Sequence, residues 1–182
     1  MVDKIIKRIA GWRGRLLSYA GRLVLLKACL ASIPIYLLSI IKFPKWAIKM
    51  INSQMGHFLW NNTDDIHTYH LASWQLVAQK KEEGGLGISD LRSLNLALLA
   101  SWIFRYHLHK NVIWVKIVDF KYNTNDPNIF CCPDLGSSPF WKGVFWAAQA
   151  THMGVKWVVG NRKKVRFWED QWVGNTSLTI MF

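Results

Sequence analysis

The chain has 182 residues, of which 51% are apolar and 11 are tryptophan. This composition excludes an intrinsically disordered protein and allows one domain with a real core, or two small ones. The formal net charge of +12 favours a polyanionic partner, either nucleic acid or an acidic membrane surface, over a basic face kept only for solubility.

The positive charge is concentrated at two places in the chain. Residues 1–49 hold ten Lys and Arg residues and only one acidic residue. A second basic cluster consists of Arg162, Lys163, Lys164 and Arg166. The chain has three cysteines, two of them adjacent at Cys131 and Cys132, and this odd number favours a reducing compartment over a secreted disulfide framework.

The first predicted element is a helix over residues 1–31. Apolar residues that recur at spacings of three and four form one face of this helix: Leu16, Ala20, Leu23, Leu26 and Leu30. On another face, three arginines are seven residues apart: Arg8, Arg15 and Arg22. Gly11 and Gly14 weaken the continuity of the helix between the first two of these arginines.

Residues 21–41 are apolar enough to raise the question of a membrane span. The longest segment without a charge covers residues 28–41, which is shorter than the roughly 20 residues that a spanning helix needs. Pro34 lies within this segment and favours a break near Ile33, because proline lacks the N–H and clashes with the preceding turn. The sequence therefore predicts two buried elements, at 21–32 and 35–41.

A further helix is expected to begin with Pro44 at its first position. Its buried stripe is predicted to consist of Ala47, Ile51, Met55, Phe58 and Leu59. Residues 61–65 have the composition of a turn or loop. A short apolar element is possible at 73–77, and glycine content predicts a turn at 80–87.

Ser89 or Asp90 is positioned to cap the next predicted helix. Its apolar stripe comprises Leu91, Leu94, Leu98, Trp102 and Tyr106. The segment from Leu96 to Phe104 is apolar on most sides, so we expect deep burial there.

The fold class predicted for the chain is mainly α, with a small C-terminal β-hairpin. Residues 123–139 contain three prolines and are the best candidate for a linker, which predicts a helical region at 1–122 and a small C-terminal region at 140–182. The hairpin is expected because two apolar runs flank Gly160 and Asn161.

The residues that suggest catalysis or metal binding have simpler structural explanations. Asp64 and Asp65 follow Asn and Thr residues, a composition typical of a solvated loop and not of a rigid magnesium site. His67 and His70 lack the further ligands that zinc needs. The Gly84–Gly87 segment lacks the Lys-Ser/Thr of a phosphate-binding loop. We therefore expect no catalytic residue, no metal site and no cofactor in this chain.

The order of several motifs resembles the region behind the polymerase core of LINE-type (non-LTR) retrotransposon reverse transcriptases, especially the plant type. The motifs are "GWRGRLLSYAGRLVLLKACLASIPIYLLSIIKFP", "FLWNN", "ASW", "KKEEGGLGISDLRSLNLALLASWIFR" and "GNRKKVRFWEDQWVG". The resemblance runs across nearly the whole chain. It implies a helical thumb-like bundle and connector. The family's catalytic aspartates, which would use magnesium, lie upstream of this region, and its zinc-binding segment lies downstream.

The resemblance also implies a partner, since a polymerase thumb holds the backbone of the template–primer duplex. Such contacts give affinity without sequence information. The residues expected to bind phosphates are Arg13, Arg15, Arg22, Lys27, Arg162, Lys163, Lys164 and Arg166. Separated from a polymerase core, the chain is expected to be poorly soluble. The alternatives are a membrane-associated protein anchored by residues 23–41, and a co-opted protein-interaction module.

Overall fold

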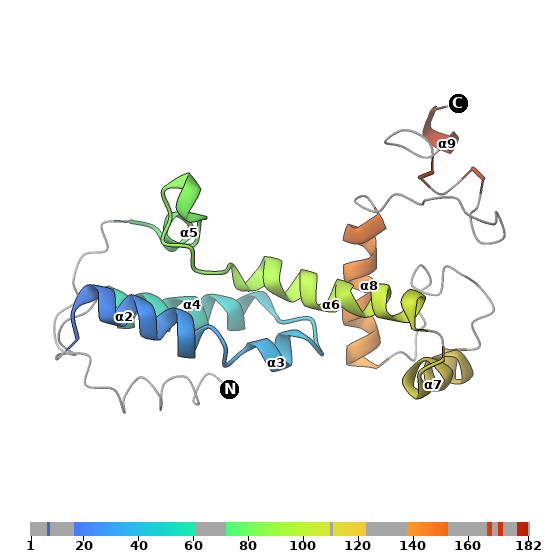
Figure 1. Cartoon of the computed structure of the whole chain (residues 1–182), viewed down its shortest axis with the longest axis horizontal. Helices are drawn as coiled ribbons and strands as arrows, with labels where there is room; N and C mark the ends of the chain where they lie inside the picture. The colour runs from blue at the N-terminus through green and yellow to red at the C-terminus, as the bar shows by residue number, and fades with distance from the viewer. Residues whose placement is uncertain are drawn as a thin grey trace. The chain divides into compact units, whose positions relative to one another are not determined.

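The computed structural model shows a helical chain that divides into two compact units, Met1–Leu99 and Ala100–Phe182. The residues that the structure describes are 7, 17–60, 72–109, 111–122, 138–152, 167–168, 171–172 and 178–181. The regular elements within these ranges are all helical (Figure 1): α2 (Tyr19–Leu25), η2 (Leu26–Leu30), α3 (Ile35–Leu38), α4 (Lys45–Trp60), α5 (Trp74–Val77), η3 (Lys81–Glu83), α6 (Leu91–Leu108), α7 (Ile113–Tyr122), α8 (Pro139–His152) and α9 (Leu178–Met181).

The first described helix begins at Ser18, whose hydroxyl oxygen accepts a hydrogen bond from the N–H of Gly21 (3.2 Å). α2 passes directly into η2, a π-helical turn in which the N–H of Ala31 donates to the carbonyl of Leu26. Leu26 and Leu30 are fully buried, as the predicted apolar face requires. Ala20, on the same predicted face, is exposed.

The predicted break at Pro34 is confirmed. Residues 31–34 form a turn, and α3 follows immediately. Pro34 is itself buried at the start of α3, a position where its missing N–H leaves no hydrogen bond unmade. Among the described residues, the structure shows no helix with the length and hydrophobicity that crossing a bilayer requires.

The predicted stripe of α4 is also confirmed, since all five of its residues are buried: Ala47, Ile51, Met55, Phe58 and Leu59. The helix begins one residue later than predicted. Pro44 precedes it, and its carbonyl accepts hydrogen bonds from the N–H groups of Ala47 and Ile48. α2 lies along α4 (Figure 1), so the buried faces of the two helices form the centre of the first unit.

The core of the first unit collects side chains from most of its elements. Its buried members are Leu26, Leu30, Leu38, Ile51, Met55, Phe58, Leu59, Val77, Ile88 and Leu91. Val77 comes from α5, Ile88 from the segment before α6, and Leu91 from the start of α6. The short α5 and the segment after it are therefore fixed to α4 by burial of apolar surface.

The glycine-rich turn after α5 forms as predicted. The chain passes through η3, and Gly84 and Gly87 then take positive φ angles of 85° and 68°. This conformation is strained for residues with a side chain. At Gly85, an added Cβ would lie only 2.1 Å from the carbonyl oxygen of Gln79. The sequence KEEGGLG is thus required by backbone geometry at three of its positions.

α6 is buried less evenly than its composition predicts. Leu91, Asn95 and Leu99 are buried along one face, whereas Ala97 and Phe104 are exposed. The prediction of deep burial from Leu96 to Phe104 is therefore only partly right. A helix that is apolar on most sides is covered all round only when neighbours surround it, and here the packing is one-sided.

In the second unit, aromatic rings join α6, α7 and α8. The ring of Trp102 meets those of Trp114 and Phe140 edge to face, with centroids 5.5 and 5.4 Å apart. The Tyr106 hydroxyl donates a hydrogen bond to the Asp119 carboxylate. Edge-to-face pairs contribute about 0.5–1.5 kcal/mol beyond the area they bury, so these rings give the unit a specific helix arrangement.

The prediction of a C-terminal β-hairpin is wrong. The described part of the chain contains no strand, and Phe167 and Trp168 form a turn. Their carbonyls accept hydrogen bonds from nearby groups and not from a partner strand: the indole N–H of Trp172 donates to Phe167, and the N–H of Thr179 to Trp168. The described residues of the second apolar run belong instead to a local aromatic cluster, in which the centroids of the Phe167 and Trp172 rings lie 5.2 Å apart.

Two predicted features fall largely outside the described residues. The turn at Gly160 and Asn161 lies outside them, as does the loop at 61–65. Only Ser138 and Pro139 of the predicted linker at 123–139 are described. The predicted boundaries at 122 and 140 therefore remain a prediction, and the structure itself divides the chain between Leu99 and Ala100.

Candidate nucleic-acid interface

Most of the residues predicted to bind phosphates lie outside the described part of the chain. These residues are Arg13, Arg15, Arg162, Lys163, Lys164 and Arg166. The same holds for Asp64, Asp65, His67, His70, Cys131 and Cys132, so the structure places none of them.

The two described residues of the predicted phosphate-binding set differ in exposure. The side chain of Arg22 is only 4% exposed, and it lies on the buried side of α2, one turn before Leu26. A buried arginine is tolerated only when its guanidinium is paired, so Arg22 belongs to the packed interior of the first unit. Lys27 is half-buried, and its Nζ lies 3.6 Å from the position that a Cβ on Gly87 would take.

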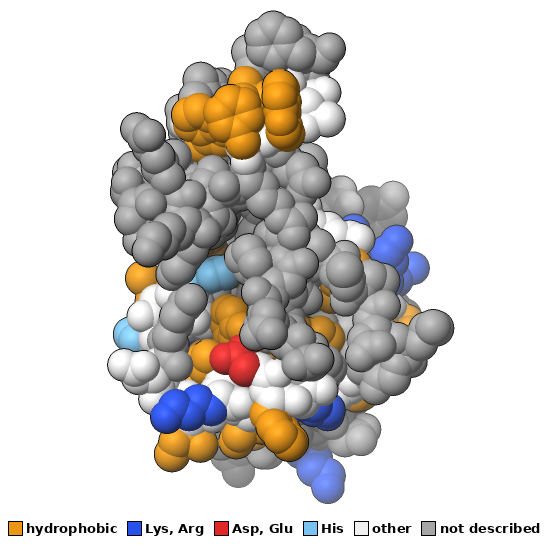
Figure 2. Space-filling view, turned by 90° about the vertical axis from the view of Figure 1, so that its right-hand side faces the viewer, with side chains coloured by type: hydrophobic (Ala, Val, Ile, Leu, Met, Phe, Trp, Pro, Cys, Tyr) orange, Lys and Arg blue, Asp and Glu red, His pale blue; other side chains and the backbone are white. Residues whose placement is uncertain are grey.

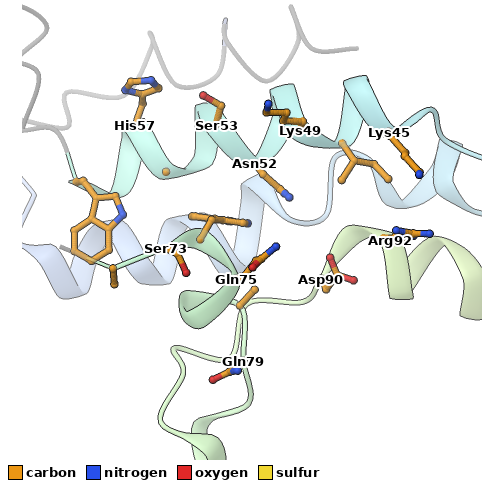
Figure 3. A pocket seen from close by; sticks show the side chains of 16 residues that line it. Lys45, Lys49, Asn52, Ser53, His57, Ser73, Gln75, Gln79, Asp90 and Arg92 are labelled. Atoms are coloured by element: carbon orange, nitrogen blue, oxygen red, sulfur yellow. The ribbon is translucent and has the colours of Figure 1, made fainter. Parts of the chain in front are cut away.

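A groove of about 1070 Å³ opens elsewhere in the first unit, between α4, α5 and the beginning of α6. The residues that line it are Lys45, Ile48, Lys49, Asn52, Ser53, Gly56, His57, Trp60, Ala72, Ser73, Trp74, Gln75, Ala78, Gln79, Asp90 and Arg92. Figure 3 shows the groove with the polar side chains labelled. We call it the α4–α5 groove.

One wall of the α4–α5 groove is a row of polar residues on α4. Lys45, Lys49, Ser53 and His57 follow one another at intervals of four, so they lie along a single side of the helix (Figure 3). Both lysines are exposed and His57 is half-buried. The opposite side of α4 is the buried stripe, which fixes the direction in which this row faces.

The second wall of the groove comes from α5. The hydroxyl oxygen of Ser73 accepts a hydrogen bond from the N–H of Leu76 and caps the helix. The ring of Trp74 lies 3.5 Å from the position that a Cβ on Gly56 would occupy, so α5 packs closely on α4 there. Gln75 and Gln79 contribute exposed amide groups to the same wall.

The start of α6 closes one end of the groove with Asp90 and Arg92. The Asp90 carboxylate accepts hydrogen bonds from the N–H and the hydroxyl of Ser93, at 2.9 and 2.7 Å. Burial alone would raise the pKa of Asp90, but these two bonds, a bond from the Arg92 backbone and the Arg92 charge together lower it. Asp90 is therefore ionised at neutral pH and committed to capping α6.

The charged side chains that line the groove are mostly positive. Lys45, Lys49 and Arg92 are all exposed. Among the described residues that line the groove, Asp90 is the one carboxylate. The amide and hydroxyl groups on both walls can donate further hydrogen bonds. Across the described residues, no group of three or more His, Cys, Asp and Glu side chains is placed to hold a metal ion.

A buried asparagine fixes α6 beside the N-terminal end of α4. Asn95 is 1% exposed, and its Nδ2 donates to the carbonyls of Leu38 (2.5 Å) and Ile41 (2.9 Å). Its Oδ1 accepts from the N–H of Phe43 (3.0 Å). These three bonds join α6 to the last residue of α3 and to the segment between α3 and α4. They hold the start of α6, with Arg92, at the end of the groove where Lys45 lies (Figure 3).

The sequence alone did not single out Lys45, Lys49 or Arg92 as binding residues. Lys45 and Lys49 belong to the basic N-terminal quarter, and their spacing of four was a usable signal. Arg92 lies more than forty residues further along the chain and joins them only through the fold. Asn95 belongs to the quoted "LNLALLASW" motif, whose structural role became visible only in its hydrogen bonds.

Comparison with known proteins gives two plant relatives, both from Arabidopsis thaliana. The chain is 32% identical over 181 residues to "Putative ribonuclease H protein At1g65750", a match that covers 98% of the chain and 29% of that protein. It is 24% identical over 143 residues to "Uncharacterized mitochondrial protein AtMg00310", covering 78% of the chain and 93% of that protein. No protein-family model and no solved structure matches the chain. The chain thus spans less than a third of the first relative, and almost its whole length has a homologous counterpart there.

Proposed function

We propose that the chain derives from a retrotransposon reverse transcriptase and corresponds to the thumb and connector behind its polymerase core. Two observations support this origin. The order of motifs resembles that region over nearly the whole chain. One relative carries the ribonuclease H name, and ribonuclease H acts on RNA–DNA hybrids, the product of RNA-templated DNA synthesis. Template-directed synthesis itself is not proposed for this chain.

We propose further that the α4–α5 groove binds the backbone of nucleic acid without sequence preference. The observation that carries this proposal is the placement of Lys45 and Lys49 on one wall and Arg92 at the end of the groove, with Asp90 committed to its helix cap. An open groove of about 1070 Å³ is at the upper end of the size of small-molecule pockets, and it suits a segment of polymer. Phosphate contacts from such side chains give affinity and position.

In this proposal, Lys45, Lys49 and Arg92 make phosphate contacts of the kind that the sequence predicted for Arg22. A buried guanidinium is a poor phosphate ligand, because it would have to leave its core surroundings first. Lys27 and the basic residues outside the described ranges stay predictions. They would add to the same non-specific binding.

The experiment is a titration of a fluorescently labelled RNA–DNA hybrid, and of two DNA duplexes of unrelated sequence, with the full chain at several salt concentrations. Each phosphate contact contributes a slope of about −0.9 to log K against log salt on duplex DNA. The triple variant Lys45→Gln, Lys49→Gln, Arg92→Gln is therefore expected to make the slope shallower by about 2.7 and to weaken all three ligands alike.

The matched control removes the same number of charges from exposed lysines of the second unit, with Lys116→Gln, Lys121→Gln and Lys142→Gln. This control is expected to change the slope much less. Equal effects of the two triple variants would show that net charge alone governs binding. A groove variant that binds like the parent chain would remove the groove from the interface.

A further inference from the structure

The solvent-facing side of α7 is apolar. Ile113, Ile117 and Phe120 are 75%, 59% and 92% exposed. Their spacing of four and three places them on one side of the helix, and we call them the α7 stripe. Figure 2 looks onto the side of the molecule that carries α7 and shows hydrophobic side chains next to Lys or Arg side chains at its lower edge.

The orientation of α7 is set by contacts on its other side. Val115 is 1% exposed, and the Trp114 ring lies 5.5 Å from that of Trp102 and 6.2 Å from that of Tyr106. The hydrogen bond from the Tyr106 hydroxyl ends on Asp119 of the same helix. Turning the α7 stripe inward would break this bond and expose Val115. The stripe is therefore a stable feature of the unit's surface.

Two lysines border the α7 stripe. With about 100° between successive residues of a helix, Lys116 lies about 60° to one side of Ile113 and Lys121 about 80° to the other. Both lysines are exposed. Asp119, the acidic residue of α7, is engaged by Tyr106. The surface is thus an apolar line with positive charge along both edges.

We propose that the α7 stripe is a docking surface for an amphipathic helix that has Asp or Glu along both edges of its apolar face. Helices recognise such lines through apolar anchors at i, i+3 or i+4, and i+7, and charges at the borders select the partner. A second copy of this chain would bring lysines against lysines. Nucleic acid would leave three large apolar side chains against phosphates. This surface lies in the second unit, and its function is separate from that of the α4–α5 groove.

The test uses two labelled helical probe peptides with the same leucine stripe, one bordered by Glu and the other by Lys. Fluorescence anisotropy with the full chain is expected to show the Glu-bordered peptide binding at least about tenfold more tightly at low salt, with the difference narrowing as salt screens the charges. The double variant Ile117→Ser, Phe120→Ser is expected to lose this binding. The charge-reversal variant Lys116→Glu, Lys121→Glu is expected to prefer the Lys-bordered peptide.

Trp46→Ser serves as the control, because Trp46 is 65% exposed but belongs to α4 in the first unit. This variant must bind the Glu-bordered peptide as the parent chain does. Equal binding of the two peptides, or binding that survives loss of the stripe, would overturn the proposal. So would self-association that disappears in the stripe variant during sedimentation, or stripe-dependent binding to phosphatidylserine vesicles with no preference between the peptides.

Discussion

Replacing Asn95 by alanine is expected to be the most damaging polar-to-alanine change in the first unit. The side chain is almost fully buried and bonds to three main-chain groups, at Leu38, Ile41 and Phe43. These partners lie 52 to 57 residues before Asn95 in the chain. The substitution therefore removes a connection between distant segments, and it leaves two carbonyls and one N–H without this partner.

The magnitude follows from the burial of each bond. The bond to Leu38 is buried, and a buried group left without a partner costs about 1–3 kcal/mol. The bonds to Ile41 and Phe43 are partly buried, and each contributes about 0.5–1.5 kcal/mol. The expected loss is therefore about 2–6 kcal/mol, which is a large part of the 5–15 kcal/mol that typically stabilises a domain.

The measurement is urea unfolding of the full chain followed by circular dichroism, with Asn52→Ala as the control. Asn52 is half-buried on α4, and its replacement is expected to change the free energy of unfolding by less than about 0.5 kcal/mol. Asn95→Asp is expected to be at least as damaging as Asn95→Ala at pH 7, because it buries a charge facing two carbonyls. Its defect should shrink as pH falls and the carboxyl gains a proton that it can donate. An Asn95→Ala loss below about 1 kcal/mol would refute this reasoning.

Two further predictions concern the segment between α5 and α6. Gly85→Ala is expected to lower the free energy of unfolding by at least about 2 kcal/mol, because the added Cβ would meet the carbonyl of Gln79. Gly84→Ala has open space around the added Cβ, so it is expected to cost less, about 1–2 kcal/mol for the positive φ alone. Equal losses of the two variants in thermal unfolding would contradict the clash at Gly85. Asp90→Ala is expected to cost about 1 kcal/mol at pH 7 through loss of the cap on Ser93. The pKa of Asp90 is lowered in the folded chain from its ordinary value of 3.8. The stability difference between the parent chain and Asp90→Ala is therefore fully present above pH 3.8, and it is lost as the pH falls through the pKa of Asp90 in the folded chain. A difference that is unchanged at pH 2.5 would show that the carboxylate charge plays no part.

Local features of the first unit followed from the sequence because their causes lie within one or two turns of chain. The missing N–H of Pro34 breaks the apolar segment, and the 3.6-residue period of α4 selects its buried stripe. The cap at Asp90, one of the two candidates that the sequence offered, depends on a side chain that reaches the next turn. The turn at 80–87 depends on glycines that accept positive φ.

The hairpin prediction failed because strands depend on partners that a pattern does not specify. The two apolar runs that flank Gly160 and Asn161 fit a pair of strands, but in a strand the carbonyls of Phe167 and Trp168 would need donors from a neighbouring strand. The indole N–H of Trp172 and the N–H of Thr179 satisfy them locally instead. The side-chain period alone therefore does not distinguish a strand from a turn with an aromatic cluster.

What the sequence determined by itself was the helical character of the first unit, its break at Pro34, the buried stripe of α4 and the resemblance carried by the motifs. The tertiary structure alone decided that Arg22 is buried, that Asn95 joins α6 to the segment before α4, and that Arg92 meets Lys45 and Lys49 in one groove. The physical reason is the range of the interactions. Caps, turns and helix periods act between near neighbours, whereas burial and the meeting of charges depend on which distant segments pack together.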